Sequence, residues 1–332
     1  MSQPPIRIAI NGFGRIGRTL LRILLRDAPE FELVCINEIE PLSTCAYLFQ
    51  YDSVFGPWPE EVRGEDGVLQ VGARRIPFHA EKDIRALDLN GVDIVLECTG
   101  MGGKRAMAER GIAAGARKVL VSGPSAEADV TLVLGANADS YAGEAIVSNA
   151  SCTTNALAPL ARLLDEAFGL QSGQMTTVHC YTGSQPTVDK PRAAPERSRA
   201  AALSMVPTTT SAQHQTGLVL PHLAGRIEAR AVRVPTASVS CIDFTVDLRD
   251  RPSGAEINAL LRDAATSGKV FGWTEAPLVS SDLRGRSESI VMVGPETSVS
   301  CGGLARVFGW YDNEWGFSCR MLDMARTMAA SD

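Results

Sequence analysis

The chain has 332 residues, of which 45% are hydrophobic and 21% charged, and its 32 basic and 38 acidic side chains give a formal net charge of -6. This length suggests two domains, and the composition is that of a folded protein. The acidic balance argues against general nucleic-acid binding, and no run approaches the ~20 apolar residues that cross a membrane. The first residues lack the regions of a signal peptide, so we expect a cytoplasmic protein.

Strand-like and helix-like segments alternate through the first half of the chain. This alternation predicts parallel βαβ units with helices on both faces of the sheet. In chain order, we expect a strand at 6–10, a helix around 20–24, strands at 31–36 and 92–98, a helix at 103–114 and a strand at 118–122.

The second half has a different character, because after one helix it is rich in strand-like segments. This pattern predicts a second domain of α+β type with a mixed or antiparallel sheet. The proline-containing stretch 182–199 is expected to be an irregular loop, and loops of that length are often functional. The expected elements are a helix at 157–168, strands at 175–180, 229–234, 239–248, 289–293 and 304–310, and a terminal helix at 313–330.

A glycine-rich turn joins the first predicted strand to the first predicted helix. Gly12, Gly14 and Gly17 form a GxGxxG pattern, which allows a tight turn, close approach of a pyrophosphate and close packing of helix on strand. The pattern alone also fits an ordinary strand–helix turn. Glu38 follows the next strand about twenty residues later, where a carboxylate accepts ribose hydroxyls and repels a 2′-phosphate. Together these features predict a dinucleotide site that prefers NAD.

The eight cysteines are scattered and form no CxxC pair, so we expect reduced thiols and no metal site. Seven of them fit the role of small buried residues. Cys152 differs because it lies close to the predicted start of a helix, where the helix dipole lowers a thiol pKa. On local sequence alone, a catalytic thiol and a simple buried residue beside a helix cap are equally good interpretations.

A histidine favours the catalytic interpretation of Cys152. His179 ends a predicted strand, and a strand–helix–strand return can bring the two residues to one edge of a sheet. A Cys–His pair can generate a thiolate and move a proton. The other histidines, His79, His214 and His222, show no such partner, and we expect them at the surface or in loops.

These features together resemble one family over nearly the whole chain: the phosphorylating glyceraldehyde-3-phosphate dehydrogenases, with the erythrose-4-phosphate dehydrogenases as close relatives. The octapeptide 148–155 and the segment 310–316 are the most specific parts of the resemblance. It implies a Rossmann-type doubly wound parallel sheet formed by 1–150 with 316–332, a catalytic α+β domain with a mostly antiparallel sheet formed by 151–315, and a homotetramer. The segments that carry it are 9–18, 51–53, 148–155, 177–179, 231–236 and 310–316.

The resemblance also implies a chemistry. Cys152 attacks a phosphorylated aldehyde, His179 acts as general base during oxidation, and inorganic phosphate cleaves the resulting thioester. The backbone N–H of Cys152 helps to hold the developing oxyanion. The implied cofactor is NAD, and its binding residues are Asn11, Gly12, Phe13, Gly14, Arg15, Ile16, Gly17, Glu38, Thr99, Gly100, Ser122 and Asn313.

Two phosphate sites are implied by the same resemblance. Hydroxyl groups and a guanidinium are suitable phosphate ligands, although loop hydroxyls also fit ordinary surface polarity. The implied ligands of the substrate phosphate are Thr182, Ser184 and Arg233, and those of the attacking phosphate are Ser151, Thr153 and Thr210.

Several residues depart from the commonest family pattern. Glu38 stands where aspartate is frequent, Ala156 where many members carry a second cysteine, and Ser211 where glycine usually follows Thr210. Lys190 leaves limited use of NADP open.

The retained hydroxyls of Thr182 and Ser184 favour oxidation of glyceraldehyde 3-phosphate to an acyl phosphate. The alternatives are oxidation of erythrose 4-phosphate with water as acyl acceptor, and a family member kept as a binding or regulatory protein. A semialdehyde dehydrogenase fits the thioester chemistry but not the specific segments.

Overall fold

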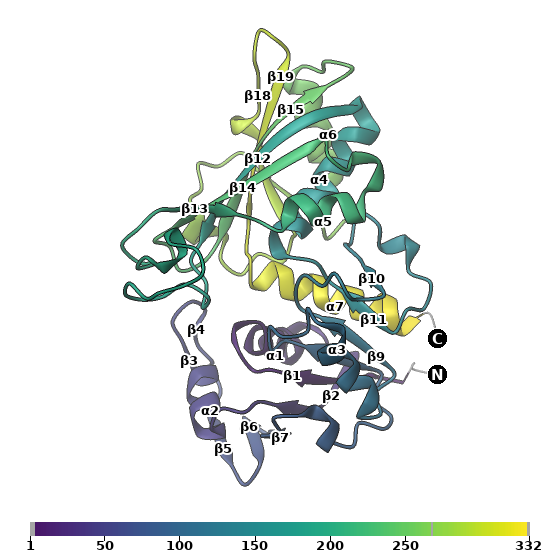
Figure 1. The fold of residues 1–332 in the computed structure, drawn as a ribbon, viewed down its shortest axis with the longest axis vertical. Coiled ribbons are helices and arrows are strands. Elements are labelled where there is room, and N and C mark those ends of the chain that lie inside the picture. The colour runs from purple at the N-terminus through teal and green to yellow at the C-terminus, as the bar shows by residue number, and fades with distance from the viewer. Residues whose placement is uncertain (1–3, 267, 331–332) are drawn as a thin grey trace. The chain divides into compact units, whose positions relative to one another are not determined.

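A computed structural model describes residues 4–266 and 268–330 of the chain. These residues form two compact units, shown as a ribbon in Figure 1. Unit 1 contains residues 4–132, 138–150 and 318–330, and unit 2 contains residues 133–137 and 151–317. Unit 1 is therefore assembled from both ends of the described chain.

Unit 1 is built on a mostly parallel sheet with the strand order β10-β11-β9-β8-β1-β2-β7-β6-β5. Neighbouring strands are parallel from β10 to β7 and antiparallel from β7 to β5. The chain passes from β1 to β2 on one side and later to β8 on the other, which confirms the doubly wound, Rossmann-type sheet. The bounds are β1 (Ile6–Asn11), β2 (Phe31–Asn37), β5 (Val62–Glu65), β6 (Val68–Val71), β7 (Arg74–His79), β8 (Ile94–Glu97), β9 (Lys118–Val121), β10 (Val130–Thr131) and β11 (Ile146–Ser148).

Helices and a short hairpin complete unit 1. The predicted helices around residues 20–24 and 103–114 are confirmed as α1 (Arg15–Asp27) and α3 (Arg105–Ala113). The sequence did not predict α2 (Leu42–Gln50) or the two-stranded pair of β3 (Tyr51–Asp52) and β4 (Gly56–Pro57).

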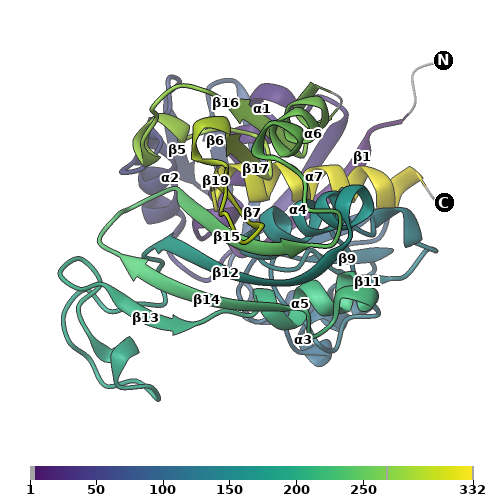
Figure 2. The same ribbon diagram turned by 90° about the horizontal axis from the view of Figure 1, so that it is seen from above.

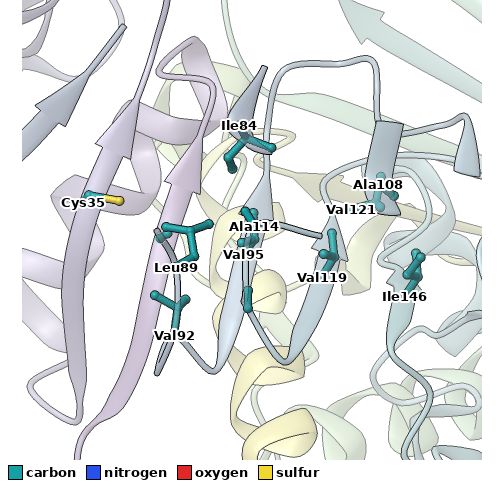
Figure 3. Packing of buried hydrophobic residues seen from close by; sticks show 12 residues of the cluster. Cys35, Ile84, Leu89, Val92, Val95, Ala108, Ala114, Val119, Val121 and Ile146 are labelled. Atoms are coloured by element: carbon teal, nitrogen blue, oxygen red, sulfur yellow. The ribbon is translucent and has the colours of Figure 1, made fainter. Parts of the chain in front are cut away.

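The core of unit 1 is close-packed along one face of β8 and β9. Val119 and Val121 alternate along β9, so both point to this face, where Val95 of β8 and Ala108 of α3 meet them. Figure 3 shows these side chains together with Ile146 of β11. The small side chain of Ala108 lets α3 lie close to the sheet. The alternating apolar residues that predicted these strands are therefore the residues that form the core.

Unit 2 contains a mostly antiparallel sheet with the order β13-β14-β12-β15-β19-β17-β16, with β18 paired to β19. Figure 2 shows β13, β14, β12 and β15 side by side. Parallel pairing occurs between β12 and β14 and between β16 and β17, and the other pairs are antiparallel. The bounds are β12 (Leu170–Cys180), β13 (Val206–Thr209), β14 (Ile227–Val234), β15 (Ser240–Leu248), β16 (Phe271–Thr274), β17 (Ile290–Val293), β18 (Ser298–Val299) and β19 (Leu304–Tyr311).

The helix α4 (Cys152–Phe168) packs on β12 and β15 of unit 2. Ser151 caps its first turn by accepting the backbone N–H of Thr154 at 3.1 Å, which starts the helix at Cys152.

The predicted irregular loop is confirmed, and its residues 182–199 contain one short 3₁₀ turn, Glu196–Ser198. Two helices that the sequence did not predict are α5 (Ala212–Val219) and α6 (Gly254–Thr266).

The helix α7 (Trp315–Ala330) enters unit 1 from residue 318 onwards. Met321, Met324 and Met328 are fully buried along it. The ammonium of Lys118 donates to the carbonyl oxygen of Met328 at 2.6 Å, and Arg326 Nε donates to Glu30 at 2.6 Å. These contacts tie the last turns of α7 to β9 and to the start of β2.

Within residues 4–266 and 268–330, none of the helices combines the length and the apolar character that crossing a membrane requires.

Candidate active site

A cavity in unit 1 lies where β1, β2 and β8 end. Each of these adjacent parallel strands delivers a short polar segment to its carboxyl end, and this edge is where doubly wound sheets bind ligands. The residues that line the cavity are Asn11, Gly12, Gly14, Asn37, Glu38, Ile39, Glu81, Lys82, Ile84, Glu97, Cys98, Thr99, Met101, Met107 and Arg110.

The glycine turn at this edge fits a dinucleotide. Gly12 has a φ of 95°, and a Cβ there would lie 2.6 Å from the backbone of Cys98 and Thr99. A Cβ on Gly17 would lie 2.2 Å from the carbonyl oxygen of Gly12, so the third glycine lets α1 pack on β1. A Cβ on Gly14 would meet nothing within 4 Å, which leaves room beside the helix N-terminus for a pyrophosphate. The residues present therefore suit NAD.

The different surroundings of Gly17 and Gly14 lead to a matched pair of predictions. Gly17→Ala should lower the free energy of unfolding by about 1–3 kcal/mol, because the methyl group overlaps the Gly12 carbonyl. Gly14→Ala should leave stability close to that of the wild type and weaken NAD binding by about tenfold or more, because the methyl group occupies the open space. Urea denaturation and calorimetric titration with NAD measure the two effects. Equal stability of both variants would contradict the packing role of Gly17.

Glu38 follows β2 directly and holds the glycine turn. Its carboxylate accepts the backbone N–H of Phe13 at 2.7 Å and, through its other oxygen, that of Ile39 at 2.7 Å. The side chain thus lies in the cavity with its position fixed by the backbone, and a carboxylate oxygen retains a further lone pair for a ribose hydroxyl.

A buried polar network beneath the cavity was missed by the sequence analysis. Asn37 Nδ2 donates to Asn11 Oδ1 at 2.9 Å, and Asn11 Nδ2 donates to Glu97 Oε2 at 2.5 Å. The other oxygen of Glu97 accepts the backbone N–H of Thr99 at 2.9 Å and also its hydroxyl. Burial raises the pKa of Glu97, and these bonds oppose that rise. The sequence signal that could have identified this network was Glu97 itself, a charged residue at the end of an apolar strand.

The remaining predicted cofactor residues of unit 1 surround the same edge without lining the cavity. Phe13 packs its ring against Phe49 and Phe78. Arg15 is bonded through its side chain to Asp52, and its backbone lies at the helix start. Ser122 follows β9, where its backbone N–H donates to Glu97 O at 3.0 Å. Ile16 lies in the first turn of α1, and Gly100 follows Thr99 with a φ of 78°.

In unit 2, the structure brings Cys152 and His179 together. Cys152 is the first residue of α4, His179 is the penultimate residue of β12, and Sγ lies 3.6 Å from Nε2. The imidazole is 4% exposed, and its Nδ1 lies 2.7 Å from the carbonyl oxygen of Cys180. When Nδ1 donates to that carbonyl, Nε2 is unprotonated and faces the thiol. When Nδ1 instead accepts from Arg233 Nη1, 2.7 Å away, Nε2 carries the hydrogen. The predicted encounter of the two residues is confirmed.

Arg233 on β14 completes this arrangement. Its Nη1 donates to Cys180 O at 3.1 Å and lies 2.7 Å from His179 Nδ1. Burial, followed by the Arg233 charge, lowers the pKa of His179 to about 3, so the imidazole is neutral near pH 7. Burial raises the pKa of Cys152, although Arg233 and the helix N-terminus act in the opposite direction. The predicted lowering of the thiol pKa is therefore wrong, because desolvation outweighs the helix dipole.

A fully enclosed hydroxyl chain lies beside the pair. The Tyr311 hydroxyl is within hydrogen-bond distance of Thr153 Oγ1 at 2.9 Å and Thr177 Oγ1 at 2.8 Å. Its ring meets the His179 ring edge-on at a centroid distance of 6.0 Å. Thr153 is 3% exposed, so in this structure its hydroxyl serves Tyr311 and does not face an open phosphate site.

A second cavity in unit 2 contains two of the three residues predicted for the substrate phosphate, Ser184 and Arg233. The third, Thr182, lies next to them, with its Oγ1 2.9 Å from Ser184 Oγ. The sequence analysis missed Arg192 and Arg197 in the same cavity, since only the tertiary fold brings the loop 182–199 next to β14. The residues that line it are Ser184, Gln185, Arg192, Ala193, Ala194, Glu196, Arg197, Val206, Thr208, Thr209 and Arg233.

The residues predicted for the attacking phosphate lie at the start of α4 and just before α5. Ser151 lies at the start of α4, where its Oγ is 2.7 Å from Thr154 Oγ1. Thr210 lines a separate groove beside α5, and its Oγ1 accepts the backbone N–H of Ala212 at 3.2 Å.

The remaining cysteines and histidines follow the predictions with exceptions. None of the eight cysteines, all in the described part of the chain, forms a disulfide, but Cys301 is exposed and Cys98 and Cys319 are only half-buried. The exposed surface position of His222 is confirmed, although it has a partner, since its Nε2 lies 3.2 Å from Asp165 Oδ2. His79 and His214 are exposed.

Comparisons with known proteins match this geometry. The domain family "Glyceraldehyde 3-phosphate dehydrogenase, NAD binding domain" matches residues 6–105, and "Glyceraldehyde 3-phosphate dehydrogenase, C-terminal domain" matches residues 151–313. The chain is 45% identical over 329 residues to glyceraldehyde-3-phosphate dehydrogenase of Xanthobacter flavus, covering 97% of this chain and 98% of that protein. It is 42% identical over 330 residues to glyceraldehyde-3-phosphate dehydrogenase 1 of Bacillus subtilis, covering 98% of each chain.

The matches cover both units, and they agree with the glycine turn of the NAD-binding part and with the Cys–His pair of the other. The resemblance drawn from the sequence segments is thereby confirmed. The chain belongs to the glyceraldehyde-3-phosphate dehydrogenase family of NAD-dependent phosphorylating aldehyde dehydrogenases.

Proposed function

We propose that this protein reversibly oxidises glyceraldehyde 3-phosphate to 1,3-bisphosphoglycerate, with NAD and inorganic phosphate, as a step of glycolysis and gluconeogenesis. The observation that carries the proposal is the 3.6 Å approach of Cys152 Sγ to the neutral His179 Nε2, with Arg233 beside them. A nucleophile with an adjacent base suits acyl transfer, and a guanidinium suits a phosphorylated substrate.

The first step is attack by Cys152 on the aldehyde carbon. The thiol proton passes to His179 Nε2 while Sγ forms its bond to carbon, and the imidazolium then gives this proton to the oxygen. The product is a thiohemiacetal on Cys152. The backbone N–H of Cys152 at the start of α4 stabilises the oxygen while it carries negative charge. A neutral imidazole is the protonation state that this step requires, and burial of His179 keeps it neutral.

In the second step His179 removes the hydroxyl proton of the thiohemiacetal, and the carbon is oxidised to a thioester. NAD, when bound, supplies the hydride acceptor for this oxidation. We propose that the glycine turn of unit 1 holds the pyrophosphate, Glu38 holds the ribose, and Thr99, Gly100 and Ser122 contribute to the same site. Asn313 of unit 2 is proposed to orient the nicotinamide amide. These roles are proposed from the family resemblance and from the hydrogen-bonding groups that each position offers.

In the third step an oxygen of inorganic phosphate attacks the thioester carbon and displaces the Cys152 thiolate. We propose Thr182, Ser184 and Arg233 as ligands of the substrate phosphate, because they lie together at the guanidinium-rich cavity. Ser151, Thr153 and Thr210 are the proposed ligands of the attacking phosphate. For Thr153 this role requires its hydroxyl to turn away from Tyr311.

The test is a kinetic comparison of two aldehydes, with and without inorganic phosphate, followed by NADH absorbance. We expect phosphate-dependent turnover of glyceraldehyde 3-phosphate with NAD and much slower turnover with NADP, because Glu38 repels a 2′-phosphate. A rate that ignores phosphate and favours erythrose 4-phosphate would instead support hydrolysis of the acyl-enzyme. Absence of turnover of both aldehydes, with and without phosphate, would support a binding or regulatory role.

We further propose that the protein is a cytoplasmic homotetramer, with domain boundaries at 150/151 and 315/316. The loop that precedes β13 supports assembly, since Val188, Leu203 and Met205 are 72%, 84% and 74% exposed. Exposed apolar side chains gathered on one loop are typical of an interface between subunits. Sedimentation equilibrium measures the assembly, and a monomer at micromolar concentration would contradict it.

A further inference from the structure

Three buried polar side chains of unit 2 meet beyond the Cys–His pair. Cys180 ends β12, Ser240 begins β15, and Asn313 follows β19; they are 1%, 1% and 7% exposed. Cys180 Sγ lies 3.1 Å from Asn313 Oδ1, and Ser240 Oγ lies 3.4 Å from the same oxygen. The backbone N–H of Cys180 donates to Ser240 Oγ at 3.1 Å.

The direction of these hydrogen bonds is determined by their chemistry. Because Ser240 Oγ already accepts the N–H of Cys180, its own hydrogen is available to Asn313 Oδ1. Burial raises the pKa of Cys180 to about 12, so its S–H also remains a donor near pH 7. Two donors therefore face one side of the Asn313 amide. That side must carry the oxygen, and the NH₂ group must point the opposite way.

Turning this amide over would place its NH₂ group against the S–H and O–H donors. A sulfur atom is a weak acceptor, so the turned amide would lose hydrogen bonds in a buried place. The asparagine is thus held in one of its two orientations before any ligand arrives.

We propose that Cys180 and Ser240 are positioning residues, which orient Asn313 so that its NH₂ group donates to the carbonyl oxygen of the nicotinamide carboxamide. The inference rests on the proposed placement of Asn313 at the nicotinamide. It assigns a use to a cysteine that the sequence analysis treated as a buried filler. It also predicts that the contribution of Cys180 is confined to the nicotinamide end of the cofactor.

The test compares Cys180→Ala with Cys180→Ser by calorimetric titration, without aldehyde or phosphate. Loss of the thiol donor should weaken NAD binding about three- to tenfold, whereas serine, which also donates, should restore it to within about twofold. ADP-ribose, which lacks the nicotinamide ring, should bind equally to the wild type and both variants. Ser240→Ala removes the second donor and should show the same selective loss for NAD.

Several outcomes would overturn the inference. They are unchanged NAD binding in Cys180→Ala, equal losses for NAD and ADP-ribose, or failure of Cys180→Ser to recover. Unchanged NAD binding in Asn313→Ala would also contradict it, because the oriented side chain would then have no contact to lose. Binding is measured without the aldehyde. The binding result can therefore be interpreted even if the protein does not catalyse the proposed phosphate-dependent oxidation.

Discussion

Replacing Cys152 with serine should lower kcat by at least about 10⁴-fold, while NAD binding remains close to that of the wild type. The substitution keeps the first residue of α4 and changes one atom, but a serine hydroxyl ionises far less readily than a thiol and forms no thioester. The decisive measurements are kcat from NADH absorbance and the affinity for NAD from calorimetry.

Cys301→Ser is the matched control, because Cys301 is exposed and is assigned no role in the reaction. This control should keep full activity. A Cys152→Ser variant that keeps more than about a tenth of wild-type kcat would rule out covalent catalysis at this position.

The second large effect is expected at His179. His179→Gln removes the base that faces the thiol and should lower kcat by about 10²- to 10⁴-fold. The alkylation of Cys152 by iodoacetamide should also slow, because no group takes up the thiol proton. His222→Gln provides a control, since His222 is exposed and its contact is with Asp165. Equal kcat for the two glutamine variants would contradict the general-base role.

The pKa of His179 also predicts the pH profile. Because its value of about 3 lies far below neutrality, the imidazole does not change charge between about pH 5 and pH 8. The raised pKa of Cys152 means that the thiolate fraction still increases over this range. Alkylation of the NAD-free protein should therefore accelerate steadily with pH. An additional inflection near pH 6.5 that disappears in His179→Gln would show that the imidazole titrates there.

The elements that the sequence predicted well are those whose apolar pattern is also their packing pattern. β8 and β9 are short apolar runs because both faces of a central parallel strand are buried. The helix α6 was missed. In α6 the buried apolar side chains are Ile257 and Leu261, too few for a clear helical stripe. Ser253 and Glu256 form a capping box at the start of that helix, and this sequence pattern could have predicted where the helix begins.

The same distinction applies to the candidate site. The Cys152–His179 pair was predictable because both residues lie at the ends of regular elements whose connection has a standard geometry. Glu97 was missed because its role depends on the side chain of Asn11, which lies on another strand, β1. The Arg192 and Arg197 cavity was missed because an irregular loop has no periodicity from which its position could be inferred. The sign of the Cys152 pKa shift depends on burial, which local sequence does not specify.

The membership of α7 in unit 1 has a consequence for biosynthesis. Residues 4–150 leave the ribosome first, but their unit lacks Met321, Met324 and Met328 until unit 2 has been translated. Domains generally fold as they emerge, whereas this unit must wait with an uncovered apolar surface. Unit 2, whose residues 151–317 are nearly continuous, has no such delay. We therefore expect part of the apolar core of the NAD-binding unit to stay uncovered until translation of α7 is complete.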